Sequence, residues 1–262
     1  RRRVPEVRGR RGEYRPDRRV GHFLAGGVGA GAGLRDAAAG DPVGTAFERA
    51  IAGMSRGAGT NTQFGSLLLV VPLVRAAAAA DRDLSPDGAA AVVEATTVAD
   101  AAAFYRAFEH VDVAVADPPE GMSELDVRRG AEAIPALETR ELTLHDVLSR
   151  SHEDSNATEW TTGFRRTFGT AAGMVDDEGP LTARIARAFL DRLATDEDTL
   201  VRTRHGAAVA TEIRERAAAA RGDPDAVSAL DADLLDRGIN PGATADLVTA
   251  AALVALQRGV SV

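Results

Sequence analysis

The chain has 262 residues, 45% of them hydrophobic, so it is long and apolar enough to bury a substantial core. Its net charge is −8, but residues 1–20 carry nine Arg against three carboxylates (+6), which leaves −14 on residues 21–262. An acidic body opposes nonspecific binding to nucleic acid, so no nucleic-acid partner is expected. The lack of Cys and Lys excludes disulfides, thiol nucleophiles, a Walker-type phosphate lysine and a Schiff-base lysine.

All 31 basic residues are Arg. An acidic body with Arg in place of Lys fits a salt-rich cytoplasm of the haloarchaeal type, and it fits a GC-rich genome equally well. Both interpretations predict a cytoplasmic protein. The alternative is export, because Arg18-Arg19 followed by an apolar stretch to Leu34 imitates a twin-arginine signal. Five glycines between residues 26 and 33 weaken that apolar stretch, and the first helix of the fold explains it as well.

The longest apolar run covers residues 64–80, and Pro72 and Arg75 interrupt it. It falls short of a good membrane span and is typical of a buried helix. No membrane partner is therefore expected.

Helix start signals recur along the chain, and no β-branched alternating run of strand length is present. Ser85-Pro86 is typical of a helix N-terminus, and Thr97 and Thr143 each precede an Asp at capping-box spacing. We predict a compact all-α single domain of about ten helices over residues 21–262, after a basic, poorly ordered segment over residues 1–20. The expected helices cover residues 18–38, 43–56, 62–80, 86–95, 97–114, 143–150, 157–176, 182–195, 206–221, 224–237 and 242–258.

Two glycine patterns imitate known catalytic or binding motifs. Residues 53–57 match the G-x-S-x-G nucleophile elbow around Ser55, but the strand that this motif requires is missing. Residues 27–31 suggest a dinucleotide loop, but no register gives G-x-G-x-x-G. We interpret the first as the C-terminal turn of a helix and the second as close helix packing. The histidines have no zinc-site spacing.

Four other segments suit the binding of a polyphosphate. The polar loop of residues 57–65 leads into the most apolar helix, and Asn240-Pro241 caps another helix, so both place helix N-termini where anions bind. Residues 126–130 and 198–206 combine Arg side chains suited to phosphate with carboxylates able to bind Mg²⁺. Taken alone, each such segment is more often a cap, a turn or a surface ion pair than a phosphate site.

Taken in order, these segments resemble the triphosphoribosyl-dephospho-CoA synthase family. Residues 61–65 (Asn-Thr-Gln-x-Gly) are similar to its V-N-T-H-x-G signature, and residues 126–137 to its R-G-E-A…P-L stretch. Residues 198–206 are similar to its D-T-N-V…R-G-G, and residues 240–247 to its S-P-G-G-S-A-D-L. The resemblance covers residues 21–262.

The departures from this pattern indicate a divergent member. Gln63 replaces the signature histidine, Leu200 replaces the asparagine of D-T-N, and the second segment lacks its Glu. Residues 1–20 have no counterpart of the family's T-P-K-P-G-x-V-D-R loop or of its H-x-D element. We interpret this as an aberrant or truncated start, and we expect that restoring a family-like start strengthens nucleotide binding.

The resemblance implies a transferase that joins the triphosphoribosyl group of ATP to 3′-dephospho-CoA, releases adenine and uses Mg²⁺. Carried over residue by residue, it implies Asp126, Asp198 and Asp246 as catalytic residues, with Asp126 and Asp198 also on the metal. The implied substrate-binding residues are Asn61, Thr62, Gln63, Gly65, Arg128, Arg129, Arg202, Arg204, His205, Asn240 and Gly242. We also predict that the Asn61 and Asn240 loops line one pocket, since phosphate recognition requires convergent donors.

Two alternatives stay open. One is a related nucleotide-dependent transferase with a different acceptor, and the other is a helical ligand-binding protein that has lost its chemistry.

Overall fold

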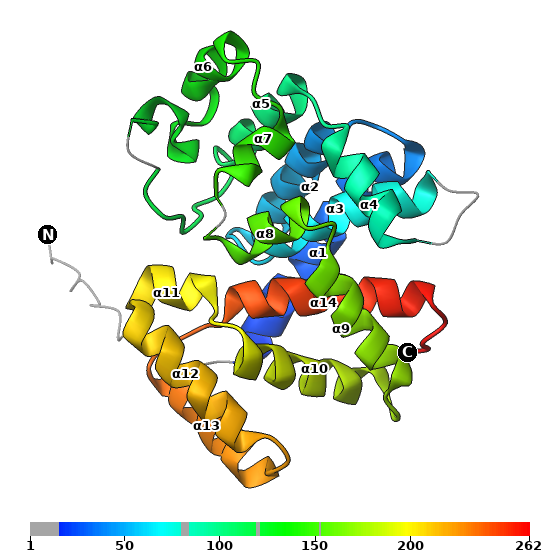
Figure 1. The fold of residues 1–262 in the computed structure, drawn as a ribbon, viewed down its shortest axis with the longest axis vertical. Coiled ribbons are helices and arrows are strands. Elements are labelled where there is room, and N and C mark those ends of the chain that lie inside the picture. The colour runs from blue at the N-terminus through cyan, green and yellow to red at the C-terminus, as the bar shows by residue number, and fades with distance from the viewer. Residues whose placement is uncertain (1–15, 80–83, 119–120, 152) are drawn as a thin grey trace, which may run out of the picture.

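The computed structural model describes residues 16–79, 84–118, 121–151 and 153–262. Over these ranges it has fourteen α-helices, two 3-10 helices and no strand (Figure 1). The helices are α1 (Pro16–Ala39), α2 (Val43–Ala58), α3 (Phe64–Ala78), α4 (Pro86–Glu94), α5 (Val98–Ala107), η1 (Ser123–Leu125), η2 (Val127–Ala133), α6 (Ile134–Thr139), α7 (Leu144–Ser149), α8 (Ser155–Thr161), α9 (Arg165–Asp176), α10 (Leu181–Thr195), α11 (Thr199–His205), α12 (Ala207–Ala220), α13 (Pro224–Asp236) and α14 (Gly242–Gln257).

The all-α class is confirmed, but the expected number of about ten helices is too low. The helix expected over residues 157–176 is two helices, α8 and α9, because Gly163 and Phe164 both have positive φ, 66° and 58°, which breaks a helix. The expected set also lacks α6 and α11. Each has fewer than eight residues, too short for a periodic pattern to be recognised.

Three of the predicted helix starts are confirmed, but Asn240 is not a cap, because α14 begins at Gly242 after Pro241 and has no side-chain cap hydrogen bond. The Ser85 side chain accepts a hydrogen bond from the Gly88 amide at 3.2 Å, and Thr97 and Thr143 both form complete capping boxes. Asp100, the partner of Thr97, also accepts from the Gly44 amide of α2 at 2.7 Å. The same carboxylate therefore caps the start of α5 and anchors α5 to α2.

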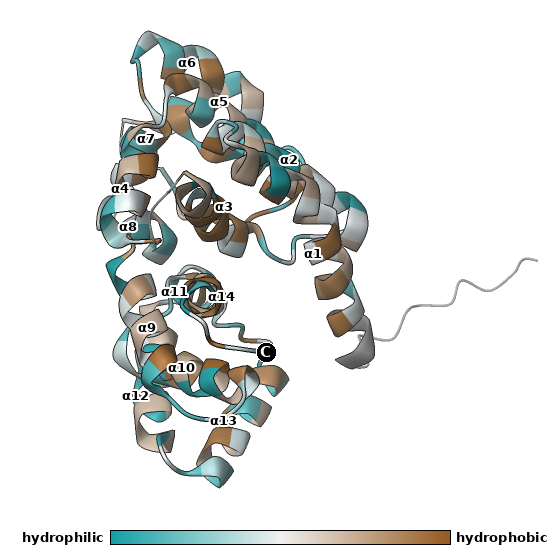
Figure 2. Ribbon diagram, turned by 90° about the vertical axis from the view of Figure 1, so that its right-hand side faces the viewer, coloured by the Kyte–Doolittle hydropathy of each residue, from teal (hydrophilic) through white to brown (hydrophobic). Residues whose placement is uncertain are grey.

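The two most apolar helices, α3 and α14, form the centre of the molecule. They run side by side in the same direction, and both are seen end-on in Figure 2, with α1 and α2 on one side and α4, α8 and α9 on the other. Phe47, Phe64 and Phe104 fill the core beside α3, with ring centroids 5.1 to 6.4 Å apart. The Trp160 indole donates to the Leu68 carbonyl at 3.1 Å and joins α8 to α3. The parallel arrangement brings the N-terminal ends of α3 and α14 together.

The two misleading glycine patterns meet each other at the contact between α1 and α2. A Cβ on Gly29 would overlap the Gly53 carbonyl, and a Cβ on Gly53 would overlap that of Gly29. Ser55 lies inside α2, where its hydroxyl donates to the His110 carbonyl at 2.7 Å. Residues 27–31 are therefore a helix-packing segment, and residues 53–57 lie in the last turns of α2, each as we interpreted it.

A second, smaller hydrophobic cluster lies below α14, among α10, α11, α12 and α13. Its most buried members include Leu193, Val201 and Ile213, and the α12–α13 pair projects at the bottom of Figure 1. Val201 of α11 belongs to this cluster, so the cluster holds α11 in place beside α14.

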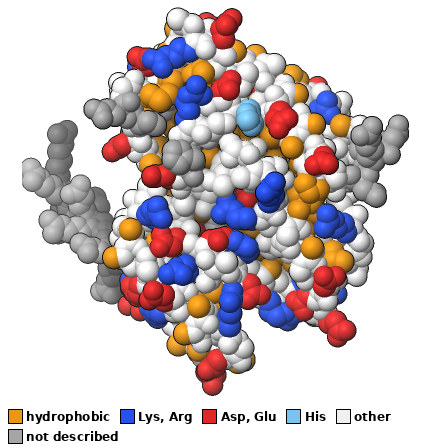
Figure 3. Space-filling view, in the orientation of Figure 1, with side chains coloured by type: hydrophobic (Ala, Val, Ile, Leu, Met, Phe, Trp, Pro, Cys, Tyr) orange, Lys and Arg blue, Asp and Glu red, His pale blue; other side chains and the backbone are white. Residues whose placement is uncertain are grey.

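Helix α1 begins at Pro16 and includes the last part of the basic segment, while residues 1–15 lie outside the described residues. The predicted poor order of residues 1–20 and the role of the chain start therefore stay predictions. Acidic and basic side chains are interspersed over the face seen in Figure 3. Within the described ranges, no helix has both the length and the apolar character that a membrane crossing requires.

Candidate functional site

The N-terminal ends of α3, α8, α11 and α14 meet at one place in the molecule. The Ser66 hydroxyl of α3 donates to Asp246 of α14, and the Asn156 amide of α8 donates to the same carboxylate. The Ser155 amide of α8 donates to the Thr199 hydroxyl of α11 at 3.2 Å. We call this place the helix-terminal cluster, and it consists of Gly65, Ser66, Asp154, Asn156, Asp198, Thr244 and Asp246.

Asp246 is the centre of the cluster. Its Oδ1 accepts from Ser66 Oγ at 2.6 Å, and its Oδ2 accepts from Asn156 Nδ2 at 3.1 Å. Burial raises the pKa of Asp246 to about 6, the two hydrogen bonds oppose that rise, and the negative charges of Asp198 and Asp154 add to it. A carboxyl group with this pKa is suited to accept a proton near neutral pH.

Asp198 is a structural part of the cluster. It caps α11, with Oδ1 accepting from the Val201 amide at 3.0 Å, while Oδ2 accepts from the Thr244 amide of α14 at 2.7 Å. Its side chain is buried, and burial raises its pKa although these amides oppose the rise. With both oxygens bound to backbone amides, Asp198 fixes α11 against the start of α14.

Asp154 caps α8 and is the third carboxylate of the cluster. Its Oδ1 accepts from the amides of Asn156 and Ala157, each at 2.9 Å. Asp154 is an exposed residue, yet desolvation by the neighbouring protein raises its pKa, and the charge of Asp198 raises it further. Three carboxylates with raised pKa values therefore lie around the ends of these helices.

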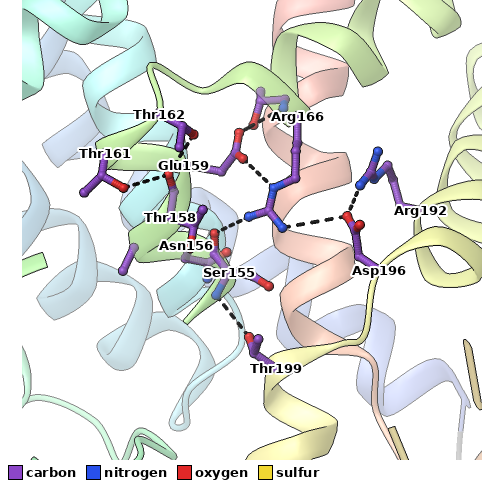
Figure 4. A network of polar contacts seen from close by, with 12 residues as sticks. Ser155, Asn156, Thr158, Glu159, Thr161, Thr162, Arg166, Arg192, Asp196 and Thr199 are labelled. Carbon is purple, nitrogen blue, oxygen red and sulfur yellow. Dashed lines mark hydrogen bonds and ion pairs between the residues drawn. The ribbon is translucent and has the colours of Figure 1, made fainter. Parts of the chain in front are cut away.

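An ion-pair network around the buried Glu159 supports the start of α8 (Figure 4). Arg166 donates from Nε to Glu159 at 2.8 Å and from Nη2 to the Ser155 carbonyl at 2.6 Å, and its Nη1 lies 3.7 Å from Asp196. Glu159 is 0% exposed, and Arg192 forms a second ion pair with Asp196. The network connects α8, α9 and α10 and holds the first residue of α8 in place.

The N-terminal ends of α3 and α14 also give the cluster a positive electrostatic potential. Helices α3 and α14 have 15 and 16 residues, long enough for each to carry a partial positive charge at its N-terminus. In a helix that begins at Phe64, the amides of Gly65 and Ser66 have no acceptor within the helix. Backbone donors beside a carboxyl group of raised pKa suit a polyanionic substrate that also carries a hydroxyl group.

The four predicted residues of the first motif have different surroundings. Asn61 accepts from the Phe64 amide at 3.1 Å, and its Nδ2 donates to the Asp112 carbonyl at 3.2 Å. The Gln63 amide group donates to the Phe23 carbonyl of α1 at 3.0 Å, and the Thr62 hydroxyl donates to Gln63 at 3.4 Å. These contacts turn Gln63 toward α1. Gly65, in contrast, lies directly against Asp246.

Asn240 and Gly242 lie at the start of α14. The Gly242 amide donates to the Asn240 carbonyl at 2.8 Å, and Gly242 packs against the Leu200 side chain. Asn61 and Asn240 thus both lie beside N-termini of adjacent helices, which Ser66 and Asp246 connect. That the two loops line one pocket stays a prediction.

Asp126 and its arginines lie on another part of the fold, before and within η2. Asp126 caps η2 and accepts from Arg128 Nε at 2.9 Å, and these contacts lower the pKa of Asp126. Arg128 also donates to Asp117 at 2.9 Å, while Arg129 is exposed and lies 4.0 Å from Glu132. Within the described ranges, the polar contacts of this group do not reach Asp246.

The basic residues of the third motif lie at the far end of α11. Arg202, Arg204 and His205 occupy its last turn, whereas Asp198 caps its first. Arg202 is paired with Glu197 at 2.7 Å, and Arg204 and His205 are exposed. The motif therefore contributes its carboxylate to the cluster, while its cations lie at the opposite end of the helix.

Four cluster residues were absent from the candidates that the sequence suggested: Ser66, Asp154, Asn156 and Thr244. Asp154 followed by Ser155 is a recognisable N-cap, but the predicted helix began three residues after it. The pairing of Asn156 with Asp246 joins residues 90 positions apart, and no local pattern announces it.

Asp126 and Asp198 were the expected metal ligands. The described residues contain no group of three or more His, Asp or Glu side chains arranged to hold a metal ion. The oxygens of Asp126 are bound to Arg128 and those of Asp198 to backbone amides. The chain's own residues in the described ranges therefore do not form a metal cage.

Comparisons with known proteins found a matching family model and a solved structure of similar fold. The profile of the ATP:dephospho-CoA triphosphoribosyl transferases matches residues 8–261. The crystal structure of a proposed triphosphoribosyl-dephospho-CoA synthase from Archaeoglobus fulgidus is similar, with a TM-score of 0.75 and 24% sequence identity. The match covers 91% of this chain and 100% of that one. No curated protein matches.

Proposed function

Because the chain belongs to the ATP:dephospho-CoA triphosphoribosyl transferase family, we propose that the helix-terminal cluster is the site of its transfer reaction. The observation that carries this proposal is Asp246, a carboxylate of raised pKa that lies where the N-termini of α3 and α14 meet. The acceptor is dephospho-CoA, and the donor is ATP.

In the transfer, the 2′-hydroxyl oxygen of dephospho-CoA forms a bond to C1′ of the ATP ribose, and the bond from C1′ to the adenine nitrogen breaks. The hydroxyl loses a proton, adenine leaves with a proton on that nitrogen, and the triphosphate stays on the product. Breaking this bond develops positive charge on the ribose, which nearby carboxylates stabilise. The site must therefore hold a polyanion and keep carboxylates close to C1′.

Asp246 has the properties of the general base. Its two oxygens each accept one hydrogen bond, which leaves a lone pair on each for the acceptor hydroxyl. Its pKa of about 6 makes it mostly ionised at neutral pH and still basic enough to take the proton. The negative charges of Asp154 and Asp198 add stabilisation for the developing cation, while Asp198 also fixes α14.

The triphosphate has two sets of donors. The first-turn amides of α3 lie beside Asp246 and suit one end of the substrate. We assign Arg128 and Arg129 as the second set. The segment of residues 112–117 links them to the start of α3, because the Asp112 carbonyl accepts from Asn61 and Asp117 accepts from Arg128. Mg²⁺ enters as the counterion of ATP, since Mg²⁺ is commonly held through substrate phosphates. We assign Arg202, Arg204 and His205, in the last turn of α11, to the parts of the substrates that lie farthest from Asp246.

The test is mass spectrometry of the full chain incubated with ATP, Mg²⁺ and dephospho-CoA. We expect release of free adenine and a product that carries the added triphosphoribosyl group. The control replaces dephospho-CoA by CoA, and a second control omits the acceptor. Adenine released without a product of dephospho-CoA would contradict the proposed acceptor, and no turnover of ATP under any condition would contradict the proposed function.

A further inference from the structure

We propose that Ser66 and Asn156 are positioning residues that hold the Asp246 carboxylate in a single orientation for proton transfer, with Gly65 providing the space for it. This inference rests on the proposed function, because it assumes that Asp246 accepts a proton in the reaction.

The first support is the geometry of the two donors. Ser66 Oγ lies 2.6 Å from Oδ1 of Asp246, and Asn156 Nδ2 lies 3.1 Å from Oδ2. The donors come from two different helices, α3 and α8, and the acceptor from a third, α14. A carboxylate with both oxygens held from separate helices cannot rotate about its last bond without losing both hydrogen bonds. Its free lone pairs therefore keep one direction.

The second support is Gly65. A Cβ at this position would overlap the Asp246 carboxylate and the Asn156 amide nitrogen. Gly65 adopts ordinary helical geometry inside α3, so backbone conformation does not require glycine here. The requirement comes from the close approach of α3 to the carboxylate. Gly65 therefore admits Asp246 to this place, and its expected role in substrate binding stays a prediction.

The third support is the way Asn156 is used. The residue is 8% exposed, and its Oδ1 is buried without a hydrogen-bond partner among the described residues. An unpaired buried acceptor destabilises a fold. Among the residues that the structure describes, the Asn156 side chain bonds to Asp246. A side chain kept for stability alone would pair both of its polar atoms, so the contact with Asp246 is what Asn156 contributes.

The charges around Asp246 explain why two donors are needed. Besides burial, the negative charges of Asp198, the cap of α11, and Asp154, the cap of α8, raise the pKa of Asp246, while Arg166 lowers that of Asp154. These carboxylates and burial favour the protonated, inactive form of Asp246. Ser66 and Asn156 favour the ionised form, and they are the groups of α3 and α8 that bind it.

The experiment is a carbon-13 NMR titration of the carboxyl groups in the full chain, with Asp246 assigned by comparison with Asp246→Asn. The variants are Ser66→Ala and Asn156→Leu. The matched control is Ser228→Ala, because the Ser228 hydroxyl donates to the Pro224 carbonyl at 2.9 Å on the exposed side of α13. We expect the pKa of Asp246 to rise by about one unit in each variant, since a hydrogen bond to a charged group is worth about that much. The control should leave the pKa unchanged.

Stability and rescue separate positioning from folding. Asn156→Leu should keep the melting temperature within about 2 °C of the wild type, because it removes an unpaired buried acceptor together with the bond to Asp246. Ser66→Thr, which keeps the hydroxyl, should restore the wild-type pKa. An unchanged Asp246 pKa in both variants would overturn the inference. The titration needs no substrate, so its result stands whether or not the transfer reaction is observed.

Discussion

Asp246 and Asp126 are the same side chain in two opposite settings. Asp246 is surrounded by protein, faces two other carboxylates and has a raised pKa, whereas Asp126 lies against the Arg128 guanidinium and has a lowered pKa. A carboxylate paired with an arginine is kept ionised and is a poor base. The lowered pKa of Asp126 comes from Arg128, two residues along the same motif, whereas the raised pKa of Asp246 comes from burial and from residues distant in the sequence.

The largest expected effect is on catalysis at Asp246. Asp246→Asn keeps the hydrogen-bonding shape but removes the base, so kcat should fall by about 10² to 10⁴-fold. Asp126→Asn should change kcat less than about tenfold, since it only loosens Arg128. Initial rates of adenine release measure both. Equal losses in the two variants would contradict the contrast between the two carboxylates.

Asp246→Asn should also change how the free energy of unfolding depends on pH. The folded pKa of Asp246, about 6, lies above its ordinary value of 3.8, so the folded state keeps a proton that the unfolded chain releases. The wild type should therefore lose stability as the pH rises from about 4 to about 6. Asp246→Asn should lack this part of the decline, and urea unfolding at a series of pH values measures it.

The next largest effect is expected on the free energy of unfolding when Arg166 is replaced, with Arg128 as the comparison. Arg166→Met leaves Glu159, 0% exposed, without its countercharge, and should lower the free energy of unfolding by about 3 to 5 kcal/mol. Arg128→Met breaks an exposed pair and should cost about 1 kcal/mol or less. Chemical denaturation compares them directly. Combining Arg166→Met with Glu159→Gln should recover part of the loss, and no recovery would count against the buried-charge explanation.

A smaller contrast is expected between two helix caps. Asp198→Ala removes the cap of α11 and the bond to the Thr244 amide, and should cost about 2 to 3 kcal/mol. Asp223→Ala removes only the exposed cap of α13 and should cost about 1 kcal/mol. Thermal unfolding of both variants tests this ordering. A cost at Asp223 as large as that at Asp198 would show that the bond between α11 and α14 adds nothing.

The sequence was informative where a local rule determines structure. The capping boxes of Thr97 and Thr143 and the Pro-led start of α4 follow from patterns three or four residues long. The break between α8 and α9 was missed because a positive φ at Phe164 is not visible in its side-chain type. The family resemblance pointed to the segments that contain Asp198, Asp246 and Gly65.

The arrangement of the cluster could not be predicted, because it depends on contacts between distant segments. Ser66 and Asp246 are 180 positions apart, and Asn156 belongs to none of the four motifs. The motif arginines show the same limit, since Arg202 shares a helix with Asp198 but lies at its other end. Sequence motifs therefore indicated which helices matter, while the packing of α3 against α14 decides which side chains meet.

The most direct test of the central claim, that Asp246 is the base, is the pH dependence of kcat between pH 5 and 8. A base must be ionised to act, so kcat of the wild type should rise with pH along a limb with an apparent pKa of about 6 and then level off. The residual rate of Asp246→Asn should show no such limb. A wild-type rate that does not change between pH 5 and 8, or a limb that persists in Asp246→Asn, would contradict the assignment of Asp246 as the base.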